Sequence, residues 1–275
     1  MRGPLARWAF GALLCAIVAF AALPFAYAAL ASLASDGLAA GRVDSMVRWS
    51  LDNYRAIFAG QPFGRSLLNS VVVAGATTIL SLALSCGAAY ALGRVELRGR
   101  GLLLFTLLGA SMLPQVAVLS GMFELVRSLG LYNRLGALSL AYLSFTVPFT
   151  AWTLTAFMRE IPREIEEAAI MDGASPPVVV VRILLPLIGP AVAATGLLGF
   201  IAAWNEFLFA LTFTFSEQQR TVPVAIAMIS GSSAYELPWG PMMAACVIVT
   251  LPLVGLAVVF QRRIVSGLTR GAVKG

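Results

Sequence analysis

A short polar segment interrupts an otherwise strongly apolar chain at Glu164-Ile165-Glu166-Glu167-Ala168-Ala169-Ile170-Met171-Asp172-Gly173-Ala174-Ser175-Pro176-Pro177, and it continues into Arg182-Ile183-Leu184-Leu185-Pro186. Long apolar runs flank this segment on both sides, so we expect it to be a loop at a membrane surface. The residue pattern predicts two short helices. Pro162 begins the first helix and Gly173 ends it, while Ser175 and Pro176 provide the N-cap and the first residue of the second.

Seven residues of this segment follow a fixed spacing. Glu-Ala-Ala is followed after three residues by Gly, and after nine further residues by Ile-x-Leu-Pro. The residues at these positions are Glu167, Ala168, Ala169, Gly173, Ile183, Leu185 and Pro186. The pattern resembles the EAA loop of ATP-binding cassette (ABC) importer permeases. In that family the loop is a coupling helix that docks into a cleft on a separate ATPase subunit.

The resemblance implies a set of residues that couple this chain to an ATPase. They are Glu167, Ala168, Ala169, Met171, Asp172, Gly173, Ile183, Leu185 and Pro186. Ala168 and Ala169 leave a flat helix face that another protein can approach closely. The alternative is an ordinary amphipathic helix at the interface, but such a helix has no reason to keep the glycine and the distant Ile-x-Leu-Pro.

The composition indicates an integral membrane protein. Of its 275 residues, 59% are hydrophobic and 12% are charged, which is about half the charge of a typical soluble domain. Histidine is absent and the three cysteines lack the spacing of metal ligands, so we predict no metal site and no catalytic residue. The net charge of +6 is spread along the loops, and we do not expect nucleic acid as a partner.

The lysine content determines where ATP can bind. Lys274 is the lone lysine of the chain, so the phosphate-binding loop Gly-x4-Gly-Lys cannot occur here. We therefore expect no cofactor on this chain, and we expect ATP and Mg²⁺ to bind to a partner ATPase.

Six uncharged runs are long enough to cross a membrane as helices. They are residues 8–35, 66–93, 101–123, 135–158, 183–205 and 237–261. These runs predict an all-α membrane protein with six spans, and the resemblance implies the ABC importer permease fold. We expect the fifth helix to continue past Glu206 toward Phe215. The first run is longer than the apolar core of about 7–15 residues in a signal peptide, so we expect an uncleaved helix.

The spans divide the chain into three parts. Residues 1–35 form the first transmembrane helix, residues 36–65 form an external loop with a short interfacial helix, and residues 66–275 form the core permease domain with the other five spans. The coupling loop covers residues 159–182 of this domain, and a cytoplasmic tail covers residues 262–275.

The loop charges predict the orientation. With a cytoplasmic N-terminus, the inner loops carry 12 basic residues and the outer loops carry 7. The inner residues are Arg2, Arg7, Arg94, Arg98, Arg100, Arg159, Arg163, Arg182, Arg262, Arg263, Arg270 and Lys274, and the outer ones are Arg42, Arg48, Arg55, Arg65, Arg127, Arg134 and Arg220. The positive-inside rule then places both termini and the EAA-like loop in the cytoplasm. We expect a multi-pass protein of the bacterial plasma membrane.

Four polar or helix-breaking residues are candidates for a translocation path. They are Pro114, Gln115, Asn205 and Glu206. A proline inside a span breaks the backbone hydrogen bonds and needs cover from a neighbour or a cavity, although Pro114 and Pro148 can equally be inert kinks. An acid inside a span is a functional candidate, but Glu206 can instead be an interfacial residue that reaches water.

The last outer loop and the tail resemble those of maltose-type permeases. The resemblance implies that the loop contacts a binding protein through Ser232, Ser233, Tyr235 and Trp239, although an interfacial aromatic belt also explains the two aromatic residues. It implies that the tail inserts between two ATPase subunits, and the tail residues concerned are Arg262, Arg263, Gly267, Leu268, Thr269, Gly271 and Lys274. A plain positive anchor is the alternative for the tail.

These features predict the second permease subunit of a carbohydrate-uptake ABC importer of the maltose/trehalose type. The expected partners are another permease subunit in a heterodimer, two ATPase subunits, an extracytoplasmic sugar-binding protein and membrane lipid. The expected substrate is a disaccharide such as trehalose or maltose. One alternative is an ABC permease for a non-sugar solute. The other is a stand-alone secondary transporter, which usually shows internal repeats and buried charges for an ion site.

Overall fold

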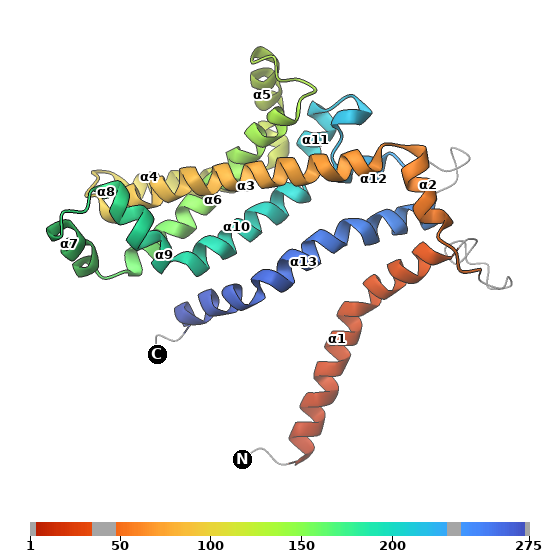
Figure 1. Ribbon diagram of the computed structural model, residues 1–275, viewed down its shortest axis with the longest axis horizontal. Coiled ribbons are helices and arrows are strands. Elements are labelled where there is room, and N and C mark those ends of the chain that lie inside the picture. The colour runs from red at the N-terminus through yellow and green to blue at the C-terminus, as the bar shows by residue number, and fades with distance from the viewer. Residues whose placement is uncertain (1–3, 35–47, 230–237, 273–275) are drawn as a thin grey trace. The chain divides into compact units, whose positions relative to one another are not determined.

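The computed structural model describes residues 4–34, 48–229 and 238–272 (Figure 1). Within these ranges the regular secondary structure is helical, apart from an isolated β-bridge between Ala34 and Trp49. The chain divides into two compact units. One comprises Met1–Gly64 and Ala225–Pro252, and the other comprises Arg65–Val224 and Leu253–Gly275.

The first unit holds α1 (Pro4–Leu33), α2 (Asp52–Gly60) and the beginning of α13 (Trp239–Ala272). Buried Asn53 joins α2 to the end of α1, because its amide Nδ2 donates hydrogen bonds of 2.9 Å to the carbonyl oxygens of Ser32 and Ala34. A Cβ atom at Gly240 would lie 2.5 Å from Oδ1 of Asn53, so this position of α13 requires glycine. The predicted short helix in the loop before residue 65 is confirmed by α2.

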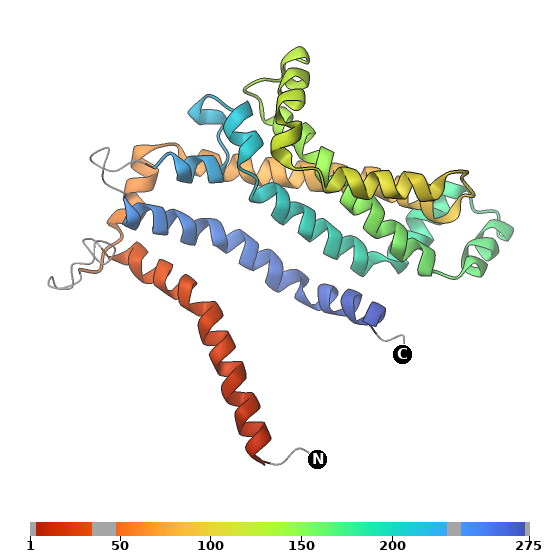
Figure 2. The same cartoon turned by 180° about the vertical axis from the view of Figure 1, so that it is seen from behind.

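The second unit holds most of the remaining helices. Its elements are α3 (Phe63–Arg94), α4 (Arg100–Ser111), α5 (Gln115–Ser128), α6 (Leu135–Glu160), α7 (Arg163–Met171), α8 (Pro176–Val178), η1 (Val179–Leu184), α9 (Leu185–Leu187), α10 (Gly189–Trp204), α11 (Leu208–Phe213), η2 (Glu217–Gln219) and the start of α12 (Val222–Ala227). Helix α6 packs against α4 and α10. Both views place α7 at the end of this unit where α3 finishes (Figures 1 and 2).

The structure contains helices that match the predicted membrane spans, but two of the predicted spans are bent. Among the described residues, the helices long and apolar enough to cross a membrane number 4, or up to 6 if each bent pair is one span. Helices α4 and α5 meet at 94°, and Pro176–Leu187 meets Gly189–Trp204 at 82°. The structure reaches the predicted number of six spans if each bent pair is one span.

Proline accounts for the first bend. Helix α4 ends at Ser111, and Pro114 is the extended N-cap of α5 with φ −60° and ψ 130°. Proline has no N–H for the helix ladder and forces the residue before it out of the helical conformation. The predicted break in the run 101–123 is thus confirmed. Pro148 behaves differently, because it is buried inside the continuous helix α6.

The structure differs from the predicted fifth span at its beginning and in its expected continuation past Glu206 toward Phe215, whereas the predicted end at Asn205 agrees with the C-cap of α10. Residues 183–187 lie before the second bend, so they do not continue into α10. At the other end α10 stops at Trp204, and a separate helix, α11, starts at Leu208. The chain leaves the helix here because the carboxylate of Glu206 binds the first free amides of α11.

A hydrophobic cluster joins the polar segment to the long helices. Its buried members are Cys86, Ala89, Leu154, Met158, Ala169, Val179, Leu184, Ile188 and Ala191. They come from α3, α6, α7, η1 and the start of α10. Close packing of α3 on α6 depends on Gly93, where an added Cβ would lie 3.2 Å from Met158. The cluster thus connects the polar segment to the two helices.

Candidate coupling site

Helix α7 is the first short helix that the sequence predicts. Its N-cap is Pro162, and Glu164 and Glu166 lie in its first turn, where negative charge is favourable next to the helix dipole. Gly173 ends it with φ +82°. The N–H of Gly173 donates to Ile170 O at 2.9 Å, and the N–H of Ala174 donates to Ala169 O at 3.0 Å.

This pair of hydrogen bonds is the left-handed C-cap that glycine favours. The predicted role of Gly173 as helix terminator is confirmed. Ser175 and Pro176 likewise occupy the predicted N-cap and first position of α8, although the Ser175 side chain makes no capping hydrogen bond.

The EAA-like residues divide into an exposed set and a buried set. Glu167, Ala168 and Asp172 are exposed, and Met171 has an exposed fraction of 87%. Ala169 is buried in the hydrophobic cluster. The expectation that Ala169 shares an approachable face with Ala168 is therefore wrong, because successive helical residues point about 100° apart.

The distant part of the motif has a packing role within this chain. Ile183 and Leu185 are partly buried and pack against the same hydrophobic cluster, while Pro186 is exposed. The spacing of the motif thus brings Ile183 and Leu185 to the cluster that also buries Ala169. The α7 part of the motif presents exposed residues to another protein.

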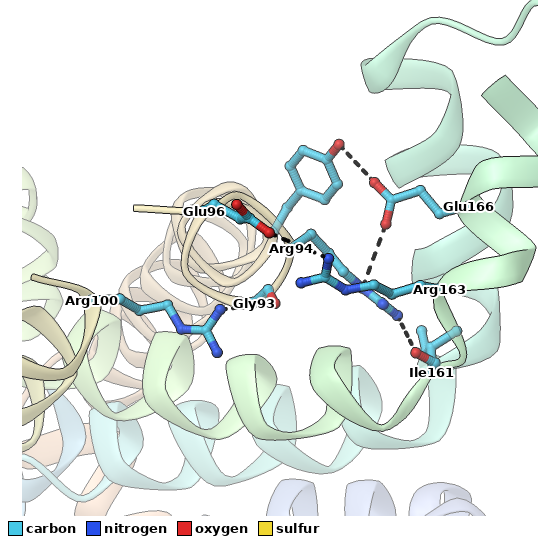
Figure 3. A network of polar contacts seen from close by, with 8 residues as sticks. Gly93, Arg94, Glu96, Arg100, Ile161, Arg163 and Glu166 are labelled. Atoms are coloured by element: carbon cyan, nitrogen blue, oxygen red, sulfur yellow. Dashed lines mark hydrogen bonds and ion pairs between the residues drawn. The ribbon is translucent and has the colours of Figure 1, made fainter. Parts of the chain in front are cut away.

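Three polar side chains attach α7 to the end of α3 (Figure 3). The Tyr90 hydroxyl donates to Oε1 of Glu166 at 3.0 Å. Nε of Arg94 lies 3.6 Å from Oε2 of Glu166. The Arg94 and Glu166 side chains are only 4% and 14% exposed. Arg94 also donates from Nη2 to the carbonyl oxygen of Ile161 at 2.6 Å, so it binds the chain between α6 and α7.

Other arginines surround this attachment. Arg163 of α7 forms an exposed ion pair with Glu96 at 3.7 Å. Arg159 and Arg100 donate to the carbonyl oxygens of Leu92 and Gly93 at 3.3 and 3.5 Å. Cations are favourable there, because the last carbonyl groups of α3 carry the negative end of the helix dipole.

Sequence reasoning did not assign a site role to Tyr90, Arg94 or Glu166. In the sequence Arg94 is one of the inner-loop charges, and Glu166 is the residue just before the motif. The available signal was an aromatic and a basic residue four positions apart at the end of a span. Their acidic partner is 76 residues from Tyr90, and no local pattern connects the two.

The candidate path residues do not share one surface. Pro114, Gln115 and Asn205 are exposed, whereas Glu206 is only 5% exposed. Asn205 donates from Nδ2 to the carbonyl oxygen of Ile201 at 2.9 Å. Their role in a translocation path stays a prediction.

Glu206 instead caps α11. Oε1 accepts from the N–H of Phe209 at 2.8 Å, and Oε2 accepts from the N–H of Ala210 at 3.2 Å. The buried Tyr142 hydroxyl interacts with this carboxylate, but its geometry falls short of a hydrogen bond. The alternative in which Glu206 reaches water is wrong within this chain, because burial and capping hold the carboxylate inside the fold.

The other predicted contact residues lie partly outside the described residues. Ser232, Ser233, Tyr235 and Lys274 fall there. Trp239 is the first residue of α13 and is 42% exposed. Helix α13 continues to Ala272, so the tail from Arg262 to Gly271 is helical, although its side chains are outside the described set.

Comparison with known proteins identifies the family. The family model described as "binding-protein-dependent transport system inner membrane component" matches residues 83–270. The chain belongs to this family. The permease is 41% identical over 267 residues to the trehalose/maltose transport system permease protein MalG of Thermococcus litoralis, covering 96% of this chain and 95% of that protein.

A second curated relative has a similar identity. The permease is 41% identical over 226 residues to the trehalose transport system permease protein SugB of Mycobacterium tuberculosis, which covers 82% of each chain. Both relatives are named as transport permeases and not as enzymes.

Solved structures show the same fold. The permease superposes on a chain of a bacterial ABC transporter that imports alginate with a TM-score of 0.80 and 21% identity, covering 96% of this chain and 99% of the other. A second structure, of a bacterial alginate ABC transporter in complex with a pentasaccharide-bound periplasmic protein, gives a TM-score of 0.64 and 15% identity, with 92% of each chain covered. The predicted all-α ABC permease fold is confirmed.

Proposed function

We propose that this permease is the second membrane subunit of an ATP-driven importer that takes up a sugar, and that α7 is its coupling helix. The observation that carries the proposal is the exposed surface of α7. Glu167, Ala168, Met171 and Asp172 face outward on a helix that the chain's own core and two α3 side chains hold in place. A helix with one face packed against its own chain and the other face exposed can transmit a force from another protein to the helices it packs on.

ATP hydrolysis takes place on a separate chain. The permease has a single lysine and lacks a phosphate-binding glycine-rich loop, so it cannot supply the ATP site itself. Two ATPase subunits bind ATP and Mg²⁺, close on each other and move α7. The path between this permease and its partner permease then opens outward, and hydrolysis returns it inward. The permease performs no covalent chemistry.

The substrate is a disaccharide such as trehalose or maltose. Relatives with 41% identity are named for trehalose and maltose or for trehalose, and a third, 40% identical over 226 residues, is named for sulfoquinovosyl glycerol, which also carries a sugar. A non-sugar solute has no comparable support. Transport by a permease of this family requires a soluble binding protein, which delivers the sugar from outside through the loop before α13.

The orientation follows from the loop charges. Both termini and α7 face the cytoplasm, where ATP is present, and the plasma membrane of a bacterium is the proposed location. In this orientation the ends of α5 and α11 lie toward the outer face.

The test is to tag this chain, extract native membranes gently and identify the proteins that co-purify in stoichiometric amounts. We expect an ATPase and a second permease by mass spectrometry, and a sugar-binding protein that binds a disaccharide when screened. Purification of the chain alone, with solute transport retained in vesicles, would contradict the proposal and favour a secondary transporter.

A further inference from the structure

We propose that Tyr90, Arg94 and Glu166 form a clamp that makes α7 move together with the cytoplasmic ends of α3 and α6. The three are positioning residues, which act by holding α7, the proposed coupling helix. This inference rests on the proposed function, since it specifies how a push on α7 reaches the long helices.

Two side chains on one face of α3 approach the same carboxylate on α7. Tyr90 and Arg94 are four residues apart, so their side chains leave α3 on the same side. One binds Oε1 of Glu166 at 3.0 Å and the other approaches Oε2 at 3.6 Å. Both carboxylate oxygens are thus engaged by α3 (Figure 3).

Arg94 extends the clamp to a third element. Its Nη2 donates to the carbonyl oxygen of Ile161, the C-cap residue of α6, at 2.6 Å. One guanidinium therefore binds both the end of α6 and the carboxylate on α7. A displacement of α7 relative to α3 would break the hydrogen bond from Tyr90 to the Glu166 carboxylate, a charge-assisted bond of the stronger class, and would separate the Arg94–Glu166 ion pair.

Burial makes separation of the clamp unfavourable. The Arg94 and Glu166 side chains are 4% and 14% exposed, so pulling them apart would leave charges without partners in a poorly solvated place. The apolar contact of α7 alone is small, because Ala169 is the single buried residue of this helix. The clamp is thus the principal polar attachment that keeps α7 fixed to the helices behind it.

The chain provides a matched control between the same two segments. Arg163 and Glu96 also connect α7 to the segment after α3, with an ion pair of 3.7 Å. Their side chains are 58% and 87% exposed, and exposed pairs contribute little because water screens them. If any charge pair between these segments were sufficient to attach α7, loss of the exposed pair would affect coupling as much as loss of the buried pair.

The experiment compares Glu166→Gln and Tyr90→Phe with the control Glu96→Gln in the purified complete transporter. Two quantities are measured per assembled complex: sugar imported per ATP hydrolysed, and hydrogen–deuterium exchange of the peptide covering 163–174. We expect Glu166→Gln to lower the import ratio by about two- to thirty-fold and to speed exchange in α7. Tyr90→Phe should act in the same direction but less, and Glu96→Gln should leave both quantities at wild-type values.

A purely structural role gives a different result. It would reduce the amount of assembled complex while the ratio and exchange in the surviving complexes stay at wild-type values, and this would overturn the clamp. If Glu166→Gln does not assemble, Tyr90→Phe decides by the same criteria, because it removes one hydroxyl and leaves the ion pair intact.

The exchange measurement separates the clamp from the proposed function. If the wild-type complex does not import sugar with ATP, the proposed function fails, while faster exchange in Glu166→Gln still supports the clamp as an attachment of α7. If import is ATP-driven but Glu166→Gln leaves the ratio and the exchange unchanged, the clamp is wrong and the proposed function stands.

Discussion

Among single residues, Gly173 determines how the coupling helix ends. Its φ of +82° is in the left-handed region, and its N–H donates to Ile170 O at 2.9 Å. Gly130 ends α5 in the same manner, with φ +67° and hydrogen bonds of 3.0 Å from its own N–H to Arg127 O and from Leu131 N–H to Val126 O. The two glycines are equivalent in backbone geometry but lie at different helices, so they form a matched pair.

Gly173→Pro should uncouple transport from ATP hydrolysis while the protein still inserts in the membrane. Proline fixes φ near −65° and has no N–H, so both features of the cap are lost. Sugar uptake should fall to background with near-normal membrane abundance, whereas Gly130→Pro should lower abundance without changing the uptake per ATP hydrolysed. Uptake at wild-type rates in the Gly173→Pro variant would exclude the coupling role of this segment.

Glu206 is a candidate path residue in the sequence, but in the structure its carboxylate caps α11. We expect Glu206→Gln to lower thermal stability by about 1 kcal/mol, the usual cost of a lost helix cap, because an amide offers one acceptor oxygen where two backbone N–H groups need one each. The sugar KM should not change. Melting curves and uptake kinetics test this, with exposed Glu217→Gln as the control. A raised KM at unchanged stability would instead place Glu206 in the sugar path.

Residue pattern alone predicted Gly173 correctly because a left-handed cap is a local feature. The pattern wrongly placed Ala169 on an exposed face and did not predict that Glu206 caps a helix. Both failures arise because burial depends on which distant helices pack against a residue. Nothing in the neighbourhood of Ala169 indicates that α3 and η1 cover it. The clamp residues were missed for the same reason.

For whole elements, the two hydrogen bonds of the Asn53 amide contribute to the attachment of α2 to α1, beside the contact of 2.8 Å between the Ser32 and Tyr54 hydroxyls. Asn53→Asp should destabilise this unit, because a carboxylate would face the carbonyl oxygens of Ser32 and Ala34 in place of a donor. A buried polar group without a partner costs about 1–3 kcal/mol. The thermal unfolding midpoint of the purified protein should fall, and Asp52→Asn on the exposed side of α2 should not change it. An unaltered midpoint for Asn53→Asp would mean that the two hydrogen bonds are dispensable.

Uninterrupted helices were the elements that the sequence predicted best. The runs 66–93 and 135–158 agree with α3 and α6 to within a few residues. A long apolar segment inside a membrane forms a helix because only then are its backbone N–H and C=O groups all hydrogen-bonded within the segment. The bends of 94° and 82° were not predicted. Pro114 indicated where a break occurs, but the angle depends on packing against other helices.

The molecule as a whole should be oriented with α7 inside the cell. Met171 and Phe215 are 87% and 76% exposed, so cysteines at these positions are accessible to a membrane-impermeant maleimide once the native cysteines are replaced. In intact cells we expect labelling of Phe215→Cys and not of Met171→Cys. Inverted vesicles should show the opposite pattern, and labelling of Met171→Cys in intact cells would reverse the proposed topology.

The most direct test of the account is uptake of labelled trehalose or maltose by the complete transporter in proteoliposomes. We expect uptake only when the ATPase subunits are present, when ATP is on the α7 side and when the binding protein is on the other side, and we expect none for the Gly173→Pro variant. Uptake by this chain alone, without ATPase or ATP, would contradict this expectation.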